Sequence, residues 1–199
     1  MKRIIVSQRV DTIESYLEQR DALDQRWAEF LWEAGYLGIP VPNHMLTLAE
    51  IIKSIPIDGI LLTGGNTPEA YGGNAPERDA SDKFLISYAA NSGKPLLGVC
   101  RGMQSILLYF GGSLRKVEGH IALRHTIVPE SGDSRFVNSY HEYAPNTLPD
   151  AFLPGAYTMD KVVEHIFHKT LPITGIMWHP EREKPFVKED VNLVRAVFK

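Results

Sequence analysis

Apolar positions along the first half of the chain alternate between two patterns. Short strands are predicted at residues 3–7, 37–41, 57–62 and 95–99, and the continuous apolar run at 57–62 is typical of a strand covered on both faces. Between them, apolar residues at helical spacing predict helices over residues 21–34, 46–54, 78–91 and 101–110. Strand–helix alternation of this kind is typical of a parallel sheet with helices on both faces.

The pattern changes after Gly111 and Gly112, where shorter segments are separated by turn residues. They predict strands at residues 125–128, 136–140, 156–159, 162–167 and 173–178, followed by a closing helix at 187–198. We therefore expect one domain over residues 1–199 with a flavodoxin-like three-layer α/β/α fold. Its central sheet should be mainly parallel, with a small antiparallel extension. Ligands of such folds bind at the carboxyl ends of the strands.

Composition limits the partners and the compartment. A net charge of −3 gives no reason to expect nucleic acid or an anionic membrane as a partner. No apolar run approaches the ~20 residues that span a bilayer. The single cysteine excludes an internal disulfide. The start, MKRIIVSQR, lacks the longer apolar region of a signal peptide, so we expect a cytoplasmic protein.

The strongest local motif runs from Gly98 to Gly102 and has Cys100 at its centre. A predicted strand precedes the cysteine and a predicted helix follows it, as in a nucleophile elbow in which cysteine replaces serine. The two glycines leave room for the sharp, strained turn that such a nucleophile requires. The helix N-terminus and Arg101 favour the thiolate, which is the attacking form. The alternative, a buried structural cysteine, requires none of these flanking features.

A base and its orienting partner follow the last predicted strand, at His179 and Glu181. Pro180 ends that strand, so His179 lies at the same sheet edge as Cys100 if the two strands are parallel. Glu181 can accept the imidazole N–H and fix the tautomer. His-Pro-Glu alone is also typical of a surface loop, but its pairing with the cysteine motif favours an active site.

Acyl transfer further requires N–H donors aimed at the developing oxyanion. The backbone N–H of Arg101, directly after the cysteine, is one candidate. The pair Gly64-Gly65 follows the predicted strand at 57–62 and lets the backbone approach a reacting carbonyl closely. Alone, two glycines after a strand indicate only a turn.

The histidines elsewhere in the chain predict no metal site. With a single cysteine no zinc pattern fits, and we expect neither a metal nor an organic cofactor. His44 and His120 are expected at the surface or in turns. His125 and His141 are candidate neighbours of the active site.

Three motifs together resemble the class I glutamine amidotransferases: Thr-Gly-Gly at 63–65, Gly-Val-Cys-Arg-Gly-Met-Gln at 98–104, and Gly-Ile-Met-Trp-His-Pro-Glu at 175–181. They occur in that family's order and spacing, and the similarity spans almost the whole chain. The resemblance implies that Cys100 forms a γ-glutamyl thioester, that His179 transfers protons and that Glu181 orients His179. It also implies an oxyanion hole formed by the backbone amides of Gly65 and Arg101, with glutamyl contacts from Gly64 and Gln104.

Cys-Arg-Gly at 100–102 and Val-Asn-Ser-Tyr-His at 137–141 look more like the γ-glutamyl hydrolase branch, which includes the γ-glutamyl-γ-aminobutyrate hydrolases. That similarity implies substrate contacts at Asn138, Ser139, Tyr140 and His141. The branch often has His-His-Gln where this chain has His-Glu-Tyr at 141–143, so we expect a different leaving-group pocket.

The N-terminal segment 8–27 resembles the γ-glutamyl-CDP-amidate hydrolases of capsular phosphoramidate biosynthesis, which release glutamate and cytidine diphosphoramidate. The resemblance implies that Arg9, Arg20 and Arg26 contact a pyrophosphate, a group that arginine suits. The alternative is a solvated helix face, since residues 18–26 also place charges at i,i+3 and i,i+4 spacing.

Three hypotheses of function fit these motifs. The first is a hydrolase that acts alone on a small γ-glutamyl amide, either nucleotide-linked or of the γ-glutamyl-γ-aminobutyrate type. The second is a glutaminase subunit that delivers ammonia to a separate synthetase, and Cys-Arg-Gly argues against such an obligate partner. The third is a non-catalytic binding protein on the same fold, which the complete Cys-His-Glu set argues against. For the loop at 66–78, a mobile lid and an ordinary loop both fit the sequence.

Overall fold

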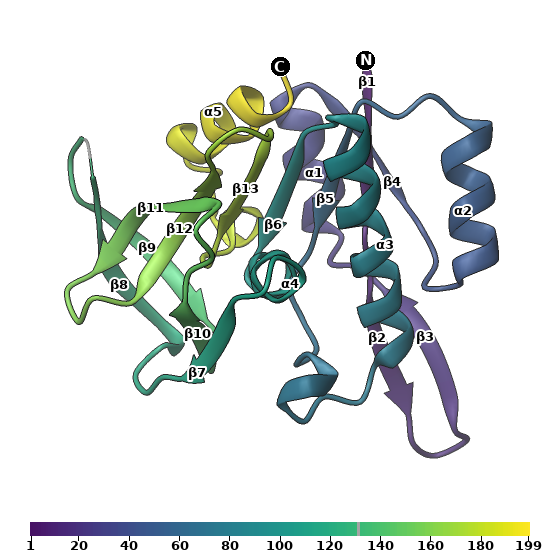
Figure 1. The fold of residues 1–199 in the computed structure, drawn as a ribbon, viewed down its shortest axis with the longest axis horizontal. Helices are drawn as coiled ribbons and strands as arrows, with labels where there is room; N and C mark the ends of the chain where they lie inside the picture. The colour runs from purple at the N-terminus through teal and green to yellow at the C-terminus, as the bar shows by residue number, and fades with distance from the viewer. Residues whose placement is uncertain (131) are drawn as a thin grey trace.

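The computed structural model describes residues 1–130 and 132–199, and within them one sheet of nine strands dominates the fold (Figure 1). The strand order is β4-β1-β5-β6-β13-β12-β11-β8-β9. The parallel strands are β4 (Tyr36–Pro40), β1 (Lys2–Val6), β5 (Gly59–Leu62), β6 (Leu96–Val99) and β13 (Ile173–Ile176). The antiparallel strands are β12 (Val163–His168), β11 (Phe152–Thr158), β8 (Ile121–Pro129) and β9 (Arg135–Tyr140).

Helices cover both faces of the parallel strands (Figure 1). One core cluster contains apolar residues of α1 (Arg26–Ala34) and α5 (Lys188–Val197), and it includes Ile4 and Val6 of β1. The other cluster contains residues of α2 (Met45–Ser54), α3 (Pro76–Ser92) and α4 (Arg101–Tyr109), and it includes Ile5. Alternate residues of β1 thus enter opposite cores, as expected for a strand covered on both faces. The predicted flavodoxin-like three-layer fold is confirmed.

Two short antiparallel ribbons stand outside the main sheet, and the sequence pattern did not predict them. They are β2 (Arg9–Ile13) with β3 (Glu18–Ala22), and β7 (Ser113–Lys116) with β10 (Tyr143–Thr147). Short 3-10 helices cover Glu69–Tyr71 and Pro180–Arg182. No helix among the described residues combines the length and apolar character that a membrane crossing requires.

The β2–β3 hairpin corrects the predicted helix at 21–34. The helix α1 begins only at Arg26, because Glu18–Ala22 pairs with Arg9–Ile13. The interpretation of residues 18–26 as a solvated helix face is therefore wrong. Glu18 and Arg20 instead form an ion pair at i,i+2 spacing, which places both side chains on the same face of the strand β3.

The strand order brings the predicted motifs to one edge of the sheet. Cys100 directly follows β6, and the glycine pair follows β5, which is the next strand. The strand β13 lies on the other side of β6, parallel to it, with Ile176 paired to Val99. The chain therefore leaves β13 toward His179 at the same edge from which β6 leads into Cys100.

Close packing of α4 on this edge explains the two glycines of the cysteine motif. A Cβ at Gly98 would lie 2.6 Å from the carbonyl carbon and oxygen of Gly102. A Cβ at Gly102 would lie 2.2 Å from the carbonyl oxygen of Leu62 in β5. Backbone therefore touches backbone at this junction, and no side chain fits.

We predict that Gly102→Ala destabilises the protein by about 3 kcal/mol, because the new methyl group overlaps backbone atoms that cannot rotate away. Gly93→Ala is the control. It has the left-handed φ of 66° but no atom within 4 Å of the added Cβ, so it should cost only about 1 kcal/mol. Urea unfolding followed by circular dichroism measures both changes. Equal losses would contradict the close-packing explanation.

Candidate active site

Cys100 occupies a strained turn between β6 and α4. Its φ of 52° and ψ of −106° lie in a region that residues other than glycine rarely adopt. Its N–H donates to the carbonyl of Ile176 at 2.7 Å, and its carbonyl accepts from the N–H of Gln104 at 3.1 Å. The residue is the N-cap of α4 and is buried, so the thiol lies at the positive end of a helix.

His179 and Glu181 form a buried hydrogen-bonded pair beside this thiol. The imidazole Nδ1 lies 2.7 Å from Oε1 of Glu181. Burial lowers the pKa of His179, but the charges of Glu181 and Cys100 and hydrogen bonds to both side chains outweigh burial and raise the pKa to about 9. The structure therefore brings Cys100, His179 and Glu181 together, with the histidine in the middle.

Gly64 makes room for the imidazole. A Cβ at this position would lie 2.4 Å from Cε1 of His179, so any other residue would displace the ring. The next residue, Gly65, has a φ of 89°, which suits glycine. Gly64 thus faces the His179 ring directly, whereas Gly65 lies against Arg9 and Arg78.

Asn138 clamps the backbone of His179. The His179 N–H donates to Oδ1 of Asn138 at 2.8 Å, and Nδ2 of Asn138 donates to the His179 carbonyl at 2.8 Å. The same Nδ2 also donates to Glu183. Asn138 was expected to contact substrate, and in the structure its amide is bonded to the backbone of His179.

Arg78 was absent from the predicted site and is a fully buried cation beneath the glycine loop. Its guanidinium donates to the carbonyls of Thr63 at 2.6 Å and Gly64 at 3.0 Å, and also to that of Gly65. Burial lowers its pKa to about 10, and negative charge on Cys100 and Asp79 opposes this effect. The sequence signal for Arg78 was the pair Arg78-Asp79 before a predicted helix, which fits the γ-glutamyl hydrolase branch but did not reveal this contact.

The Arg101 side chain binds carboxylates of α3. It pairs with Asp79 and Asp82 and donates to the Ser105 hydroxyl at 2.7 Å. Burial, followed by the neighbouring charge of Arg78, lowers the pKa of Arg101 to about 9. The guanidinium therefore still carries its charge at neutral pH. The backbone N–H of Arg101, and not its side chain, remains the part suited to an oxyanion.

The other predicted glutamyl and substrate contacts divide into two groups. Tyr140 lies beside the base, with ring centroids 5.7 Å apart, and it is partly exposed. Gln104, Ser139 and His141 are buried and bonded within the protein. Their hydrogen-bonding partners are the carbonyl of Tyr143 for Gln104, the carbonyl of His120 for Ser139, and the carboxylate of Glu164 for His141.

The three predicted phosphate contacts have different surroundings. Arg9 lines a small cavity together with His179, and its stem packs against Gly65. Arg20 is paired with Glu18 at the surface. Arg26 holds the backbone after the base instead, since it donates to the carbonyls of Glu181 at 3.1 Å and Glu183 at 2.6 Å. Arg182, which the sequence did not suggest, lines the same cavity as Arg9.

The loop at 66–78 is bound to the neighbouring ribbons. Asn66 exchanges two hydrogen bonds with the backbone of Val10 in β2, at 2.8 and 2.9 Å. The Tyr71 hydroxyl accepts the N–H of Leu114 in β7, and the Tyr71 carbonyl accepts the hydroxyl of Tyr143.

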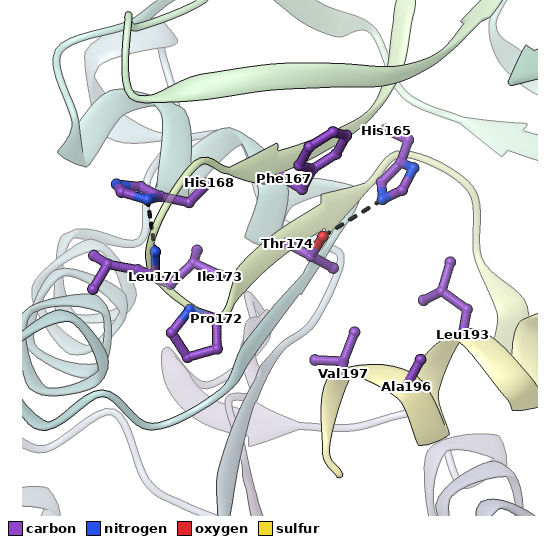
Figure 2. A pocket seen from close by; sticks show the side chains of 10 residues that line it. All are labelled: His165, Phe167, His168, Leu171, Pro172, Ile173, Thr174, Leu193, Ala196 and Val197. Carbon is purple, nitrogen blue, oxygen red and sulfur yellow. Dashed lines mark hydrogen bonds between the residues drawn. The ribbon is translucent and has the colours of Figure 1, made fainter. Parts of the chain in front are cut away.

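A separate groove of about 330 Å³ lies between β12, β13 and α5 (Figure 2). It includes Leu171 and Pro172, which precede β13, so it lies at the opposite end of this strand from His179. Figure 2 shows His165 and His168 on different parts of its wall. Burial and the charge of Arg135 lower the pKa of His165 to about 4, which leaves it uncharged near neutral pH. No residue of the candidate active site lines this groove.

Known structures and sequences match this architecture. A glutamine amidotransferase from Thermotoga maritima superposes with a TM-score of 0.68, covering 98% of this chain and 83% of that one, at 14% identity. A γ-glutamyl-γ-aminobutyrate hydrolase from Escherichia coli O157:H7 is 26% identical over 198 residues, which cover 80% of this chain and 78% of the relative. At 14% identity, the structural match to the T. maritima protein supports the fold alone.

The sequence comparisons extend over most of the chain. A γ-glutamyl-CDP-amidate hydrolase from Campylobacter jejuni subsp. jejuni serotype O:2 is 30% identical over 181 residues, which cover 89% of each chain. The family model for Peptidase C26 matches residues 4–127 and 116–181, a span that contains Cys100, His179 and Glu181. With matches of this extent, the chain belongs to the Peptidase C26 family.

Proposed function

We propose that this protein is a cysteine-dependent hydrolase of γ-glutamyl amides, with Cys100 as nucleophile, His179 as acid and base, and Glu181 as its orienting partner. The observation that carries the proposal is the buried Cys100–His179–Glu181 chain at the sheet edge beside Gly64 and Gly65. Family membership and the hydrolase relatives support the reaction class.

The chemistry proceeds in two steps. The Cys100 thiolate attacks the γ-carbonyl carbon, a C–S bond forms, and the carbonyl oxygen becomes an oxyanion near the backbone N–H groups of Gly65 and Arg101. His179 donates its proton to the leaving nitrogen as the C–N bond breaks. His179 then removes a proton from water, which attacks the thioester and releases glutamate and the free thiol.

The substrate that we propose is γ-glutamyl-CDP-amidate, cleaved to glutamate and cytidine diphosphoramidate for capsule phosphoramidate synthesis. The C. jejuni relative supports this substrate over most of the chain. The hairpin supports it too: in the strand register Asp11 lies opposite Arg20 and Arg9 lies opposite Ala22, so both arginines lie on one face of the ribbon. Arg9 and Ala22 line a small cavity that His179 also lines. The reaction needs no synthetase partner.

Glutamate release from a substrate panel tests this assignment. The purified protein should release glutamate fastest from γ-glutamyl-CDP-amidate and more slowly from γ-glutamyl-γ-aminobutyrate, a γ-glutamyl peptide and L-glutamine. Cys100→Ala should abolish release from all four, because it removes the nucleophile. Turnover of L-glutamine alone, or activity only with an added synthetase, would identify a glutaminase subunit instead. Full activity of Cys100→Ala would exclude the mechanism itself.

Arg9→Gln tests the pyrophosphate contact. We expect KM for γ-glutamyl-CDP-amidate to rise about tenfold or more, because one charge-assisted hydrogen bond is lost. KM for γ-glutamyl-γ-aminobutyrate, which carries no phosphate, should change less than about twofold. Arg3→Gln is the matched control. Arg3 is the second residue of β1, at the end of the strand away from the site edge, so its substitution should leave KM for both substrates unchanged. Equal effects of Arg9→Gln on both substrates would remove Arg9 from the phosphate site.

The pH profile tests the role of His179. Because its pKa is raised to about 9, the ring carries its proton at neutral pH and loses it as pH rises through about 9. We expect kcat/KM to fall over that range, since the leaving nitrogen then receives no proton. Glu181→Gln removes a charge that raises this pKa, so the alkaline limb should move to lower pH. If the alkaline limb stays in place in Glu181→Gln, the limb reports the titration of a group other than His179.

A further inference from the structure

A second cluster of titratable side chains lies in the antiparallel part of the sheet, apart from Cys100. His120 precedes β8, His125 lies within β8, His141 follows β9 and Glu164 lies in β12. The carboxylate of Glu164 is fully buried, and His120 is buried too, although it was expected at the surface or in a turn. The ring centroid of His120 lies 4.9 Å from that of His125 and 4.8 Å from that of His141. The proposed reaction uses none of these groups.

Three atoms of this cluster face one another without hydrogen bonds. Nδ1 of His120, Nε2 of His125 and Oε2 of Glu164 are buried and have no hydrogen-bond partner among the described residues. Nδ1 of His120 lies 3.6 Å from Oε1 of Glu164, and Nε2 of His125 lies 3.5 Å from Oε2. Both separations exceed ordinary hydrogen-bond lengths. Unpaired buried polar atoms are costly, and a cation bound between them would satisfy all three.

The remaining contacts orient the lone pairs toward that occupant. Nε2 of His120 lies 3.1 Å from Oδ2 of Asp160, and a proton on Nε2 leaves the Nδ1 lone pair facing Glu164. Nε2 of His141 lies 3.1 Å from Oε1 of Glu164 and can donate to it. A carboxylate behind a histidine ring is the usual partner of a metal-binding imidazole, since it fixes the tautomer and the ring orientation.

We propose that His120, His125 and Glu164 bind one divalent cation of the zinc type. One ligand atom from each of the three side chains lies within 4.8 Å of the others. Zinc–nitrogen and zinc–oxygen bonds are about 2.0–2.2 Å long, so two ligands of a tetrahedral ion lie about 3.4 Å apart. Each imidazole lies close to that distance from one carboxylate oxygen, since Nδ1 of His120 is 3.6 Å from Oε1 and Nε2 of His125 is 3.5 Å from Oε2.

The ligand set also selects the class of metal. Two imidazoles and one carboxylate suit zinc and neighbouring first-row cations, whereas magnesium and calcium prefer oxygen ligands. Three protein ligands leave a fourth position, which water fills. His141 and Asp160 are positioning residues for Glu164 and His120.

A cation here would fasten the antiparallel strands to the active-site edge. The Glu164 carbonyl accepts the N–H of Met177 at 2.8 Å, two residues before His179. The His120 carbonyl accepts the Ser139 hydroxyl, and Ser139 follows the Asn138 clamp directly. The ligands thus flank both segments that hold His179, and the metal would have a structural role.

Zinc binding to the Cys100→Ala protein tests this proposal. That background removes the catalytic thiol, which would otherwise compete for zinc together with His179. After chelator treatment and dialysis, the protein is titrated with ZnCl₂ against a chromophoric chelator. We expect one Zn²⁺ per chain, and Co²⁺ should give the intense d–d absorption of a low-coordinate site. Zinc should also raise the Tm, because it binds the folded state.

Variants in the same background locate the metal. His125→Gln should weaken zinc binding more than about 100-fold and abolish the Tm increase, while Asp160→Asn should weaken binding about 10–100-fold. The Asp160 side chain is 60% exposed, so its substitution leaves the core packing intact. His44→Gln, an exposed histidine at the start of α2, is the control and should bind as tightly as the parent.

Two results would overturn the proposal. One is the absence of stoichiometric zinc in the Cys100→Ala protein, which would leave protonated imidazoles as the partners of Glu164. The other is unchanged affinity in His125→Gln, which would place the metal elsewhere. Both results are independent of whether the enzyme cleaves γ-glutamyl amides, because the tested protein lacks its nucleophile.

Discussion

The close contact of α4 with β5 and β6 is the constraint on which the site depends. Cys100 holds a backbone conformation that costs about 1–3 kcal/mol, and it persists only because the surroundings leave no alternative. Gly98 and Gly102 let backbone touch backbone, and the Cys100 N–H is anchored to Ile176 of β13. Three strands and one helix therefore fix the thiol, and every other group of the site is placed relative to it.

Buried charge is the second requirement of this edge. Arg78 and Arg101 are both buried, and a buried guanidinium is costly unless it is paired or hydrogen-bonded. The terminal nitrogens of Arg78 donate to carbonyls of the glycine loop, and those of Arg101 pair with two carboxylates of α3. The same hydrogen bonds that offset the desolvation of these cations also shape the loop that would receive an oxyanion. Stability and the proposed chemistry thus rest on the same contacts.

The antiparallel strands contribute to the site by holding His179. His179 lies beyond the end of β13, where the ladder with β6 has stopped, so its position relies on contacts from the opposite side. Asn138 within β9 binds the His179 backbone twice. Glu164 of β12 binds Met177 just before it. A parallel sheet alone would present the thiol, whereas the extension keeps the imidazole beside it.

The sequence was sufficient for the features that local spacing encodes. Apolar runs and helical periodicity predicted the layers, and the order strand, Cys100, helix predicted the elbow, because these signals depend on neighbours along the chain. The tertiary structure decided the rest. Arg78 meets Thr63 across 15 residues, Asn138 meets His179 across 41, and His141 meets Glu164 across 23. The polar hairpin at residues 9–22 has no apolar periodicity at all, since it pairs with itself outside the core. Contacts of this kind leave no trace in local pattern, because the partner that satisfies a buried polar group is chosen by the fold and not by its place in the chain.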